Sequence, residues 1–61
     1  MDLEKNIKAV LSKADRKKPI GPTNIQRLAG VGYNQALHTL DEMVEQGLIT
    51  QENPYTYRWV N

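Results

Sequence analysis

The sequence contains no cysteine and no phenylalanine, and none of its apolar runs exceeds three residues. Without cysteine, neither a disulfide framework nor a cysteine-ligated zinc site can brace the fold. The short apolar runs exclude a membrane-spanning helix and a signal-peptide core, so we expect a cytoplasmic protein with no membrane partner. Without phenylalanine, the aromatic part of a core must come from three tyrosines and one tryptophan.

The 61 residues are expected to form one small domain, residues 1–61, near the lower size limit for folding on hydrophobic burial alone. The net charge is only +1, but it is unevenly distributed along the chain. Residues 1–27 contain seven basic and three acidic side chains, whereas residues 28–61 contain one basic and four acidic ones. A basic half can attract polyanions, although two solvated faces of opposite charge would explain the pattern equally well.

Apolar residues at spacings of three and four predict two helices in the first half of the chain. The first covers residues 2–14, with Asp2 as its cap, and ends in the sequence DRKKP. The second is short and begins at Thr23, because Thr23 and Gln26 have the spacing of a capping box. Gly30 is expected to end this helix in the left-handed conformation.

A third helix is predicted over residues 33–46, with Gly47 as its stop. The glycines of Gly30-Val31-Gly32 predict a tight turn before it, with Val31 anchored in the core. A short helix, a glycine-containing turn and a longer amphipathic helix form the helix-turn-helix pattern. The apolar side of the third helix is expected to consist of Tyr33, Ala36, Leu37, Leu40, Met43 and Val44.

The last part of the chain predicts a β-hairpin. Residues 48–51 form a strand candidate, Asn53-Pro54 is a turn signal, and residues 55–60 alternate at period two. An isolated apolar residue, Ile20, could add a one-residue third strand. Three helices followed by a two-stranded hairpin indicate an α+β fold, specifically a small winged helix.

The run IQRLAGVGYNQALHTLDEMVEQGLI, residues 25–49, resembles the DNA-reading gamma domain of bacterial FtsK-type chromosome translocases. The matching features are the Gln-Arg pair, the Gly-Tyr-Asn entry to the third helix and the Glu-Gln-Gly-Leu-Ile exit. The resemblance implies that the third helix lies in the major groove, that Asn34 contacts a base, and that Asp41 occupies an acidic position of the family. His38 stands where the family has an arginine, so the family's target sequence is not carried over.

Three polar residues on the outer side of the third helix are the candidates for base readout: Asn34, Gln35 and His38. Asn and Gln can pair with adenine, and His can donate to guanine. The alternative is a solvated polar face. Glu42 and Glu45 follow where the helix would leave the groove, and there they would repel phosphate.

Basic and helix-start residues are the candidates for contacts to phosphate or from the wing. For Lys17 and Lys18 the alternative is that they only keep the loop soluble. For Arg58, on the hairpin, the alternative is cation–π packing on an aromatic ring. The candidates are Lys17, Lys18, Thr23, Arg27, Tyr33 and Arg58.

The aromatic residues of the last strand, Tyr55, Tyr57 and Trp59, could form a base-stacking platform, but we expect them to pack in the core. Tyr33 is likewise expected to pack beneath the third helix, with its hydroxyl reaching solvent or phosphate.

Catalysis has little support in the sequence. Ser12 is the only serine, His38 is the only histidine, and there is no thiol. His38 with Asp41 and Glu42 could hold a metal only weakly, and the glycines fit no phosphate-loop pattern. We therefore expect no enzyme activity, no cofactor, no metal and no small-molecule substrate.

Two functions remain open from the sequence. The first is sequence-specific binding of double-stranded DNA, as a small prokaryotic, phage or plasmid transcription regulator associated with the nucleoid, or as a DNA-reading module of a larger protein. The second is a winged helix that binds a protein partner through Asp41, Glu42 and Glu45.

Overall fold

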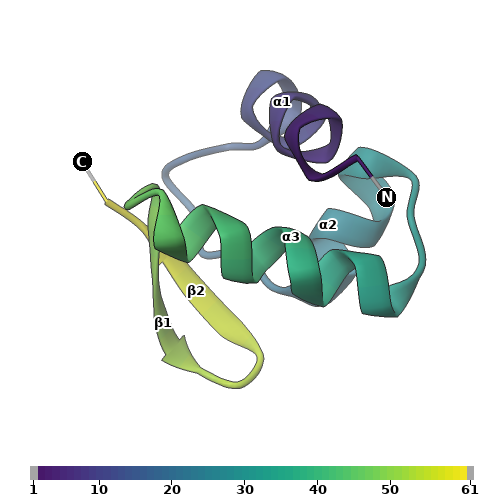
Figure 1. Cartoon of the computed structure of the whole chain (residues 1–61). Coiled ribbons are helices and arrows are strands. Elements are labelled where there is room, and N and C mark those ends of the chain that lie inside the picture. Colours follow the sequence, from purple (N-terminus) through teal and green to yellow (C-terminus); the bar gives the residue numbers. More distant parts are fainter. Residues whose placement is uncertain (1, 61) are drawn as a thin grey trace.

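Three helices and a two-stranded antiparallel hairpin follow one another along residues 2–60, the part of the chain that the computed structural model describes. This order confirms the predicted mixed α+β class. In Figure 1, α3 crosses the middle of the molecule, with α1 on one side and the hairpin on the other. The elements are α1 (Leu3–Lys13), α2 (Pro22–Ala29), α3 (Tyr33–Glu45), β1 (Ile49–Asn53) and β2 (Thr56–Trp59).

The first helix, α1, begins as the sequence predicts. The Asp2 carboxylate accepts a hydrogen bond from the Lys5 amide at 3.1 Å, which satisfies one of the free amides of the first turn. Ile7 and Val10 are buried on the side of α1 that faces the rest of the domain. The cap therefore fixes the start of a helix whose apolar stripe packs on α2 and α3.

The predicted start of α2 at Thr23 is wrong. Gly21 is the cap, and Pro22 is the first residue of the helix. The Gly21 amide donates to Asn24 Oδ1 at 2.9 Å, so Asn24 is the side chain that reaches back to the helix start. Position 21 requires glycine because a Cβ there would collide with the Tyr55 carbonyl oxygen in the hairpin. Local residues thus set the start of α2, and the hairpin turn packs closely against it.

The turn between α2 and α3 has one special residue. Gly30 ends α2 in the left-handed conformation with a φ of 67°, as predicted. Gly32 has a φ of −76°, which any residue adopts, so the turn needs only the first of its two glycines. Val31 is half-buried against the core, which confirms its role as the anchor of the turn. After α3 ends at Glu45, Gly47 turns the chain with a φ of 77°.

The hairpin carries a third, single-residue strand. In the β1–β2 pair, Ile49 lies opposite Trp59 and Gln51 lies opposite Tyr57. Ile20 forms the expected isolated bridge to Tyr57, with amide-to-carbonyl distances of 2.9 and 2.7 Å. Because this bridge is antiparallel, the chain before Ile20 runs beside the base of the hairpin and the chain after it runs toward the turn.

One hydrophobic core joins all of these elements. Val44, which was expected on the apolar side of α3, is 37% exposed and lies outside it. No helix within residues 2–60 combines the length and the apolar character that crossing a membrane requires. The buried core consists of Ile7, Val10, Ile20, Ile25, Ala36, Leu40, Met43, Ile49 and Tyr57.

The aromatic residues are divided between the core and the surface. Tyr57 is buried and Trp59 is half-buried, which confirms core packing for these two rings. The same prediction is wrong for Tyr55, which is 73% exposed in the hairpin turn. The Asn53 side chain accepts a hydrogen bond from the Tyr55 amide at 2.9 Å, so Tyr55 belongs to the turn rather than to the strand. Tyr33 is also 48% exposed instead of packed beneath α3.

Candidate nucleic-acid interface

The first half of α3 presents three uncharged polar side chains to solvent. Asn34, Gln35 and His38 are all exposed, whereas Ala36 and Leu40 of the same helix are fully buried. Burial of these two residues fixes the rotation of the helix, so the three polar side chains point outward together. The structure therefore gathers the predicted base-reading residues on one surface, which we call the α3 face (Asn34, Gln35 and His38).

A buried hydrogen-bond chain holds α3 against α1. Asn6 Nδ2 donates to Thr39 Oγ1 at 3.2 Å, and the Thr39 hydroxyl donates to the Gln35 carbonyl at 2.7 Å. Thr39 is fully buried and Asn6 is nearly so, which makes both groups costly to leave unpaired. This pair was not predicted from the sequence. Its only signal there is that each of the two residues is polar on an otherwise apolar helix face.

The starts of α2 and α3 meet the hairpin turn around a surface pocket of about 320 Å³. Two tyrosines that were expected to pack in the core, Tyr33 and Tyr55, line it with their side chains largely exposed. We call this hollow the tip pocket, because it lies beside the turn at the tip of the hairpin. It is lined by Gly21, Pro22, Thr23, Asn24, Tyr33 and Tyr55.

The electrostatics of the tip pocket come from the start of α2. The amides of the first helical turn have no partner within the helix, and the helix dipole is positive at this end. Thr23 is exposed beside them, and two tyrosines also line the pocket. Such a group can hold an anion such as a phosphate oxygen. Two of the residues predicted to contact phosphate, Thr23 and Tyr33, thus lie together in the tip pocket, and Tyr55 lies there with them.

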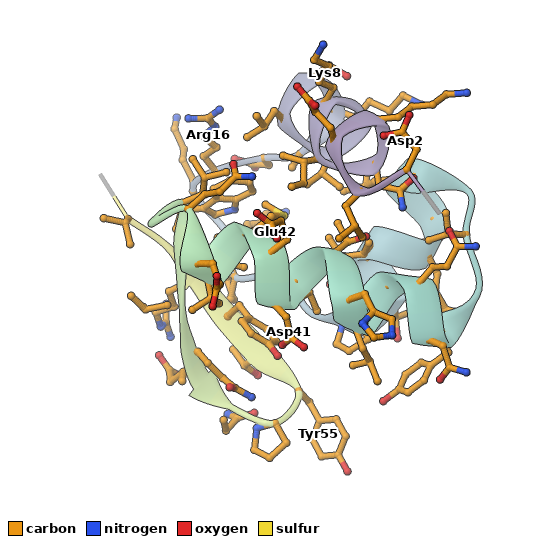
Figure 2. All side chains as sticks on the ribbon, viewed as in Figure 1. Asp2, Lys8, Arg16, Asp41, Glu42 and Tyr55 are labelled. Carbon is orange, nitrogen blue, oxygen red and sulfur yellow. The ribbon has the colours of Figure 1, made fainter. Side chains whose placement is uncertain are left out.

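Asp41 brings a negative charge to the same side of the molecule. Figure 2 shows Asp41 on the hairpin side of α3, above Tyr55. Burial raises the pKa of the Tyr57 hydroxyl, and the charges of Asp41 and Tyr33 raise it further. A phosphate placed against this part of α3 would meet the Asp41 carboxylate.

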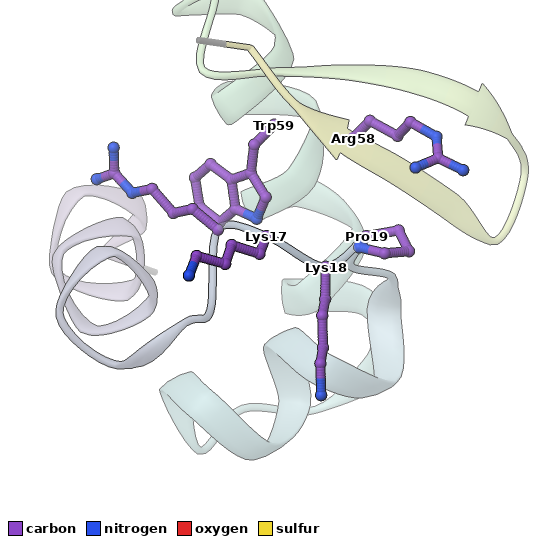
Figure 3. A pocket seen from close by; sticks show the side chains of 6 residues that line it. Lys17, Lys18, Pro19, Arg58 and Trp59 are labelled. Atoms are coloured by element: carbon purple, nitrogen blue, oxygen red, sulfur yellow. The ribbon is translucent and has the colours of Figure 1, made fainter.

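The remaining predicted phosphate contacts lie elsewhere. Lys17, Lys18 and Arg58 line a second pocket of about 470 Å³, together with Arg16, Pro19 and Trp59. We call it the base pocket, because the register places it beside the base of the hairpin. Figure 3 shows the loop lysines and the Trp59 ring around it. Arg27 is exposed in the last turn of α2, at the opposite end of that helix from the tip pocket.

Arg58 has an acidic neighbour on the outer side of the hairpin. Its guanidinium forms a hydrogen-bonded ion pair with the Glu52 carboxylate, and that contact raises the pKa of Arg58. Arg16, which the sequence analysis did not single out, takes the aromatic position instead, with its guanidinium 5.1 Å from the centre of the Trp59 ring. The cation–π contact considered for the hairpin arginine is therefore made by a loop arginine.

No three His, Asp or Glu side chains come together within residues 2–60 in a way that could hold a metal ion. The weak site considered for His38 with Asp41 and Glu42 is thus not assembled in the described part of the chain. In Figure 2, Asp41 lies on the hairpin side of α3 and Glu42 on the side toward α1. Glu42 accepts a hydrogen bond from the Gln46 side chain at 3.0 Å.

No protein-family model matches the chain, and no curated protein or solved structure is significantly similar to it.

Proposed function

We propose that the chain is a winged-helix domain that binds double-stranded DNA sequence-specifically through α3. The observation that carries this proposal is the α3 face, which is uncharged, exposed and directly beside the tip pocket. In helix-turn-helix docking, the N-terminal half of the second helix meets the base edges in the major groove. In this proposal α2, the turn at Gly30 and α3 form the helix-turn-helix, and the hairpin is the wing.

The side chains of the α3 face have the chemistry for base readout. Asn34 and Gln35 can each donate to and accept from the major-groove edge of adenine, and His38 can donate to the acceptors of guanine. The tip pocket would meet the phosphate backbone beside the groove, with the α2 amides, Thr23 and the two tyrosine hydroxyls as donors. This combination supplies both contacts that specify a sequence and contacts that position the helix.

Asp41 limits the part of α3 that can approach DNA. It lies one turn after His38, and its carboxylate would repel a phosphate on the hairpin side of the helix. Glu45, further along, is exposed and negative as well. We infer that α3 enters the groove with its first two turns only, which is the usual reach of a recognition helix.

The biological setting that we propose is a DNA-reading role in a prokaryotic cell, phage or plasmid, as a transcription regulator or as a module of a larger protein. The resemblance of residues 25–49 to the translocase gamma domain supports this setting. Catalysis is not part of the proposal. The Ser12 hydroxyl donates to the Ala9 carbonyl at 3.0 Å on α1, while the single histidine lies on α3.

One observation favours a second function, binding of a protein partner. Asp41 and Glu45 are exposed, and the only ion pair among residues 2–60 is the one between Arg58 and Glu52. Unpaired carboxylates on one helix could bind a basic protein surface. A partner of this kind would use the second half of α3 and would leave the α3 face free.

Selection of duplexes from a random pool, followed by binding measurements on the selected sequence, tests the proposal. We expect Asn34→Ala and His38→Ala each to weaken binding by roughly 10- to 100-fold, the usual discrimination of a good base contact. Binding to a scrambled duplex should change little, because phosphate contacts carry no sequence information.

Gln46→Ala is the matched control for a change on the α3 face, because Gln46 is an exposed polar residue just beyond the far end of the same helix. It should leave the affinity for both duplexes unchanged. If no sequence is enriched and no duplex is bound at low salt, the DNA proposal fails. A partner whose binding depends on Asp41 and Glu45 would then favour the second function.

A further inference from the structure

The base pocket brings together two segments that are far apart in the sequence. The loop after α1 contributes Arg16, Lys17 and Lys18, and β2 contributes Arg58 and Trp59. The cationic side chains among them are all exposed, and Trp59 is half-buried at the centre. Figure 3 shows the Trp59 ring close to Lys17, whereas the Lys18 side chain extends away from the ring. The tip-side function proposed above does not use this hollow.

The loop that carries these cations has a defined shape. The Lys17 amide donates to the Asp15 carboxylate at 2.9 Å, and the Lys18 amide donates to the Asp15 carbonyl at 3.1 Å. Two residues further along, Ile20 is held by its bridge to β2. The loop is therefore fixed at both ends, and three consecutive cations are presented at one place rather than spread along a free segment.

The charges of the base pocket are only partly neutralised. Glu52 pairs with Arg58, and the Asp15 carboxylate serves as acceptor for a backbone amide. Neither Lys17 nor Lys18 forms an ion pair within the described residues 2–60. Arg16 faces the Trp59 ring rather than a carboxylate. An excess of positive charge thus remains around one aromatic ring.

Trp59 has a hydrogen-bonding capacity that the protein does not use. Its indole nitrogen is buried and has no acceptor among the residues that the structure describes. A buried donor of this kind usually has a partner. A phosphate oxygen that entered between the lysines and displaced their side chains could accept a hydrogen bond from this indole nitrogen. Such a bond would add a directional contact to the electrostatic attraction of the cations.

We propose that the base pocket binds backbone phosphates of nucleic acid without regard to sequence, independently of the α3 face. Its lining is cationic and exposed, whereas pockets for small molecules are mostly enclosed and apolar. Lysine ammonium groups are point charges that accept phosphate in many geometries, which suits a sequence-independent contact. In Figure 2, Arg16 lies on the opposite side of the molecule from Tyr55, so the two binding regions are separate.

The single tryptophan makes the proposal directly measurable. Trp59 is the only one in the chain, so its fluorescence and its indole N–H resonance report on the base pocket alone. Titration at low salt with a duplex of arbitrary sequence should shift both signals and saturate. Inorganic phosphate, adenosine monophosphate and poly-glutamate serve as the comparison ligands, and none of them should match the duplex.

A pair of double variants tests the lysines. Lys17→Gln with Lys18→Gln should weaken duplex binding at least tenfold and lower the slope of log affinity against log salt by about 2, near 0.9 for each phosphate contact. Lys5→Gln with Lys8→Gln removes the same charge from the exposed side of α1 and should leave the slope unchanged. Circular dichroism confirms that both variants are folded.

Three results would overturn the proposal: equal losses in the two double variants, an equal Trp59 response to poly-glutamate, or a response to phosphate or adenosine monophosphate without one to the duplex. Failure of the proposed DNA readout by the α3 face would give a different result from these three. A variant with Asn34→Ala and His38→Ala should keep the Trp59 response to the duplex even where sequence preference is lost.

Discussion

The tip and the base of the hairpin offer different chemistry to a ligand. At the tip, the α3 face and the tip pocket supply amides, hydroxyls and side-chain amides, with Asp41 on the same side of the molecule. At the base, cationic side chains line the pocket around Trp59, and the indole nitrogen of Trp59 is a buried hydrogen-bond donor. Directional hydrogen bonds distinguish one base from another, whereas charge attracts any phosphate. One small domain thus separates the groups suited to specificity from those suited to general affinity.

This separation changes the meaning of the uneven charge along the sequence. The basic first half of the chain does not surround the proposed recognition helix. Instead, Arg16, Lys17 and Lys18 are carried to the base of the hairpin by the bridge at Ile20. The distribution of charge along the chain therefore does not by itself predict the distribution of charge on the surface.

The largest expected effect comes from disrupting the tip. Gly21→Ala places a Cβ against the Tyr55 carbonyl, and the backbone of the hairpin turn has to move. We expect it to lower the free energy of unfolding by about 1–3 kcal/mol, the usual cost of overpacking. Denaturant unfolding measures the loss, and amide chemical shifts should change at the tip more than around Trp59.

Gly32→Ser is the control for that substitution. Position 32 is open and has ordinary backbone angles, and serine is a better helix cap than glycine. It should leave stability unchanged or raise it by up to about 0.5 kcal/mol. Equal destabilisation by the two substitutions would contradict the close approach of α2 to the hairpin turn.

A smaller effect is expected from loosening the α3 face alone. Thr39→Val removes the hydroxyl that bonds the Gln35 carbonyl and leaves the buried Asn6 amide unpaired. We expect a loss of about 1–2 kcal/mol in the free energy of unfolding. Sequence-specific DNA binding should weaken, while the Trp59 response at the base is retained.

A double variant separates the hydrogen bond from the packing at this place. Asn6→Leu combined with Thr39→Val replaces both partners by apolar groups and should cost less than the sum of the single changes. Strict additivity of the two losses would mean that the Asn6–Thr39 bond contributes nothing to holding α1 against α3.

The smallest effect on stability is expected at the base. Glu52→Gln removes the exposed partner of Arg58, and exposed ion pairs contribute little to folding, so thermal unfolding should not change measurably. Freed from its carboxylate, Arg58 becomes available to phosphate. The salt slope of duplex binding should steepen by up to about 0.9, and an unchanged slope would place Arg58 outside the binding surface.

Much of the fold could be predicted from the sequence because its determinants are local. Helical spacing located all three helices, and Gly30 marked the end of α2 correctly. The alternation after Pro54 located β2, and an isolated apolar residue was enough to indicate the bridge at Ile20.

The predictions that failed have both local and long-range causes. Thr23 was predicted as the cap of α2, whereas Pro22 at the first helical position and the Asn24 side chain place the cap at Gly21. The Tyr55 carbonyl, more than thirty residues away, leaves no room for a side chain at that position. Tyr55 has the spacing of a core residue, but the Asn53 side chain holds it in the turn. The base pocket needs Lys17 beside Trp59, a proximity that no local pattern contains.

The bridge between Ile20 and Tyr57 also has a consequence for the order of folding. It joins two residues across most of the chain, and the entropy of closing a loop grows with its length. The helices form from contacts between near neighbours, so we expect them to appear before this bridge does. We therefore expect the tip and the base to reach their final positions only when this bridge closes.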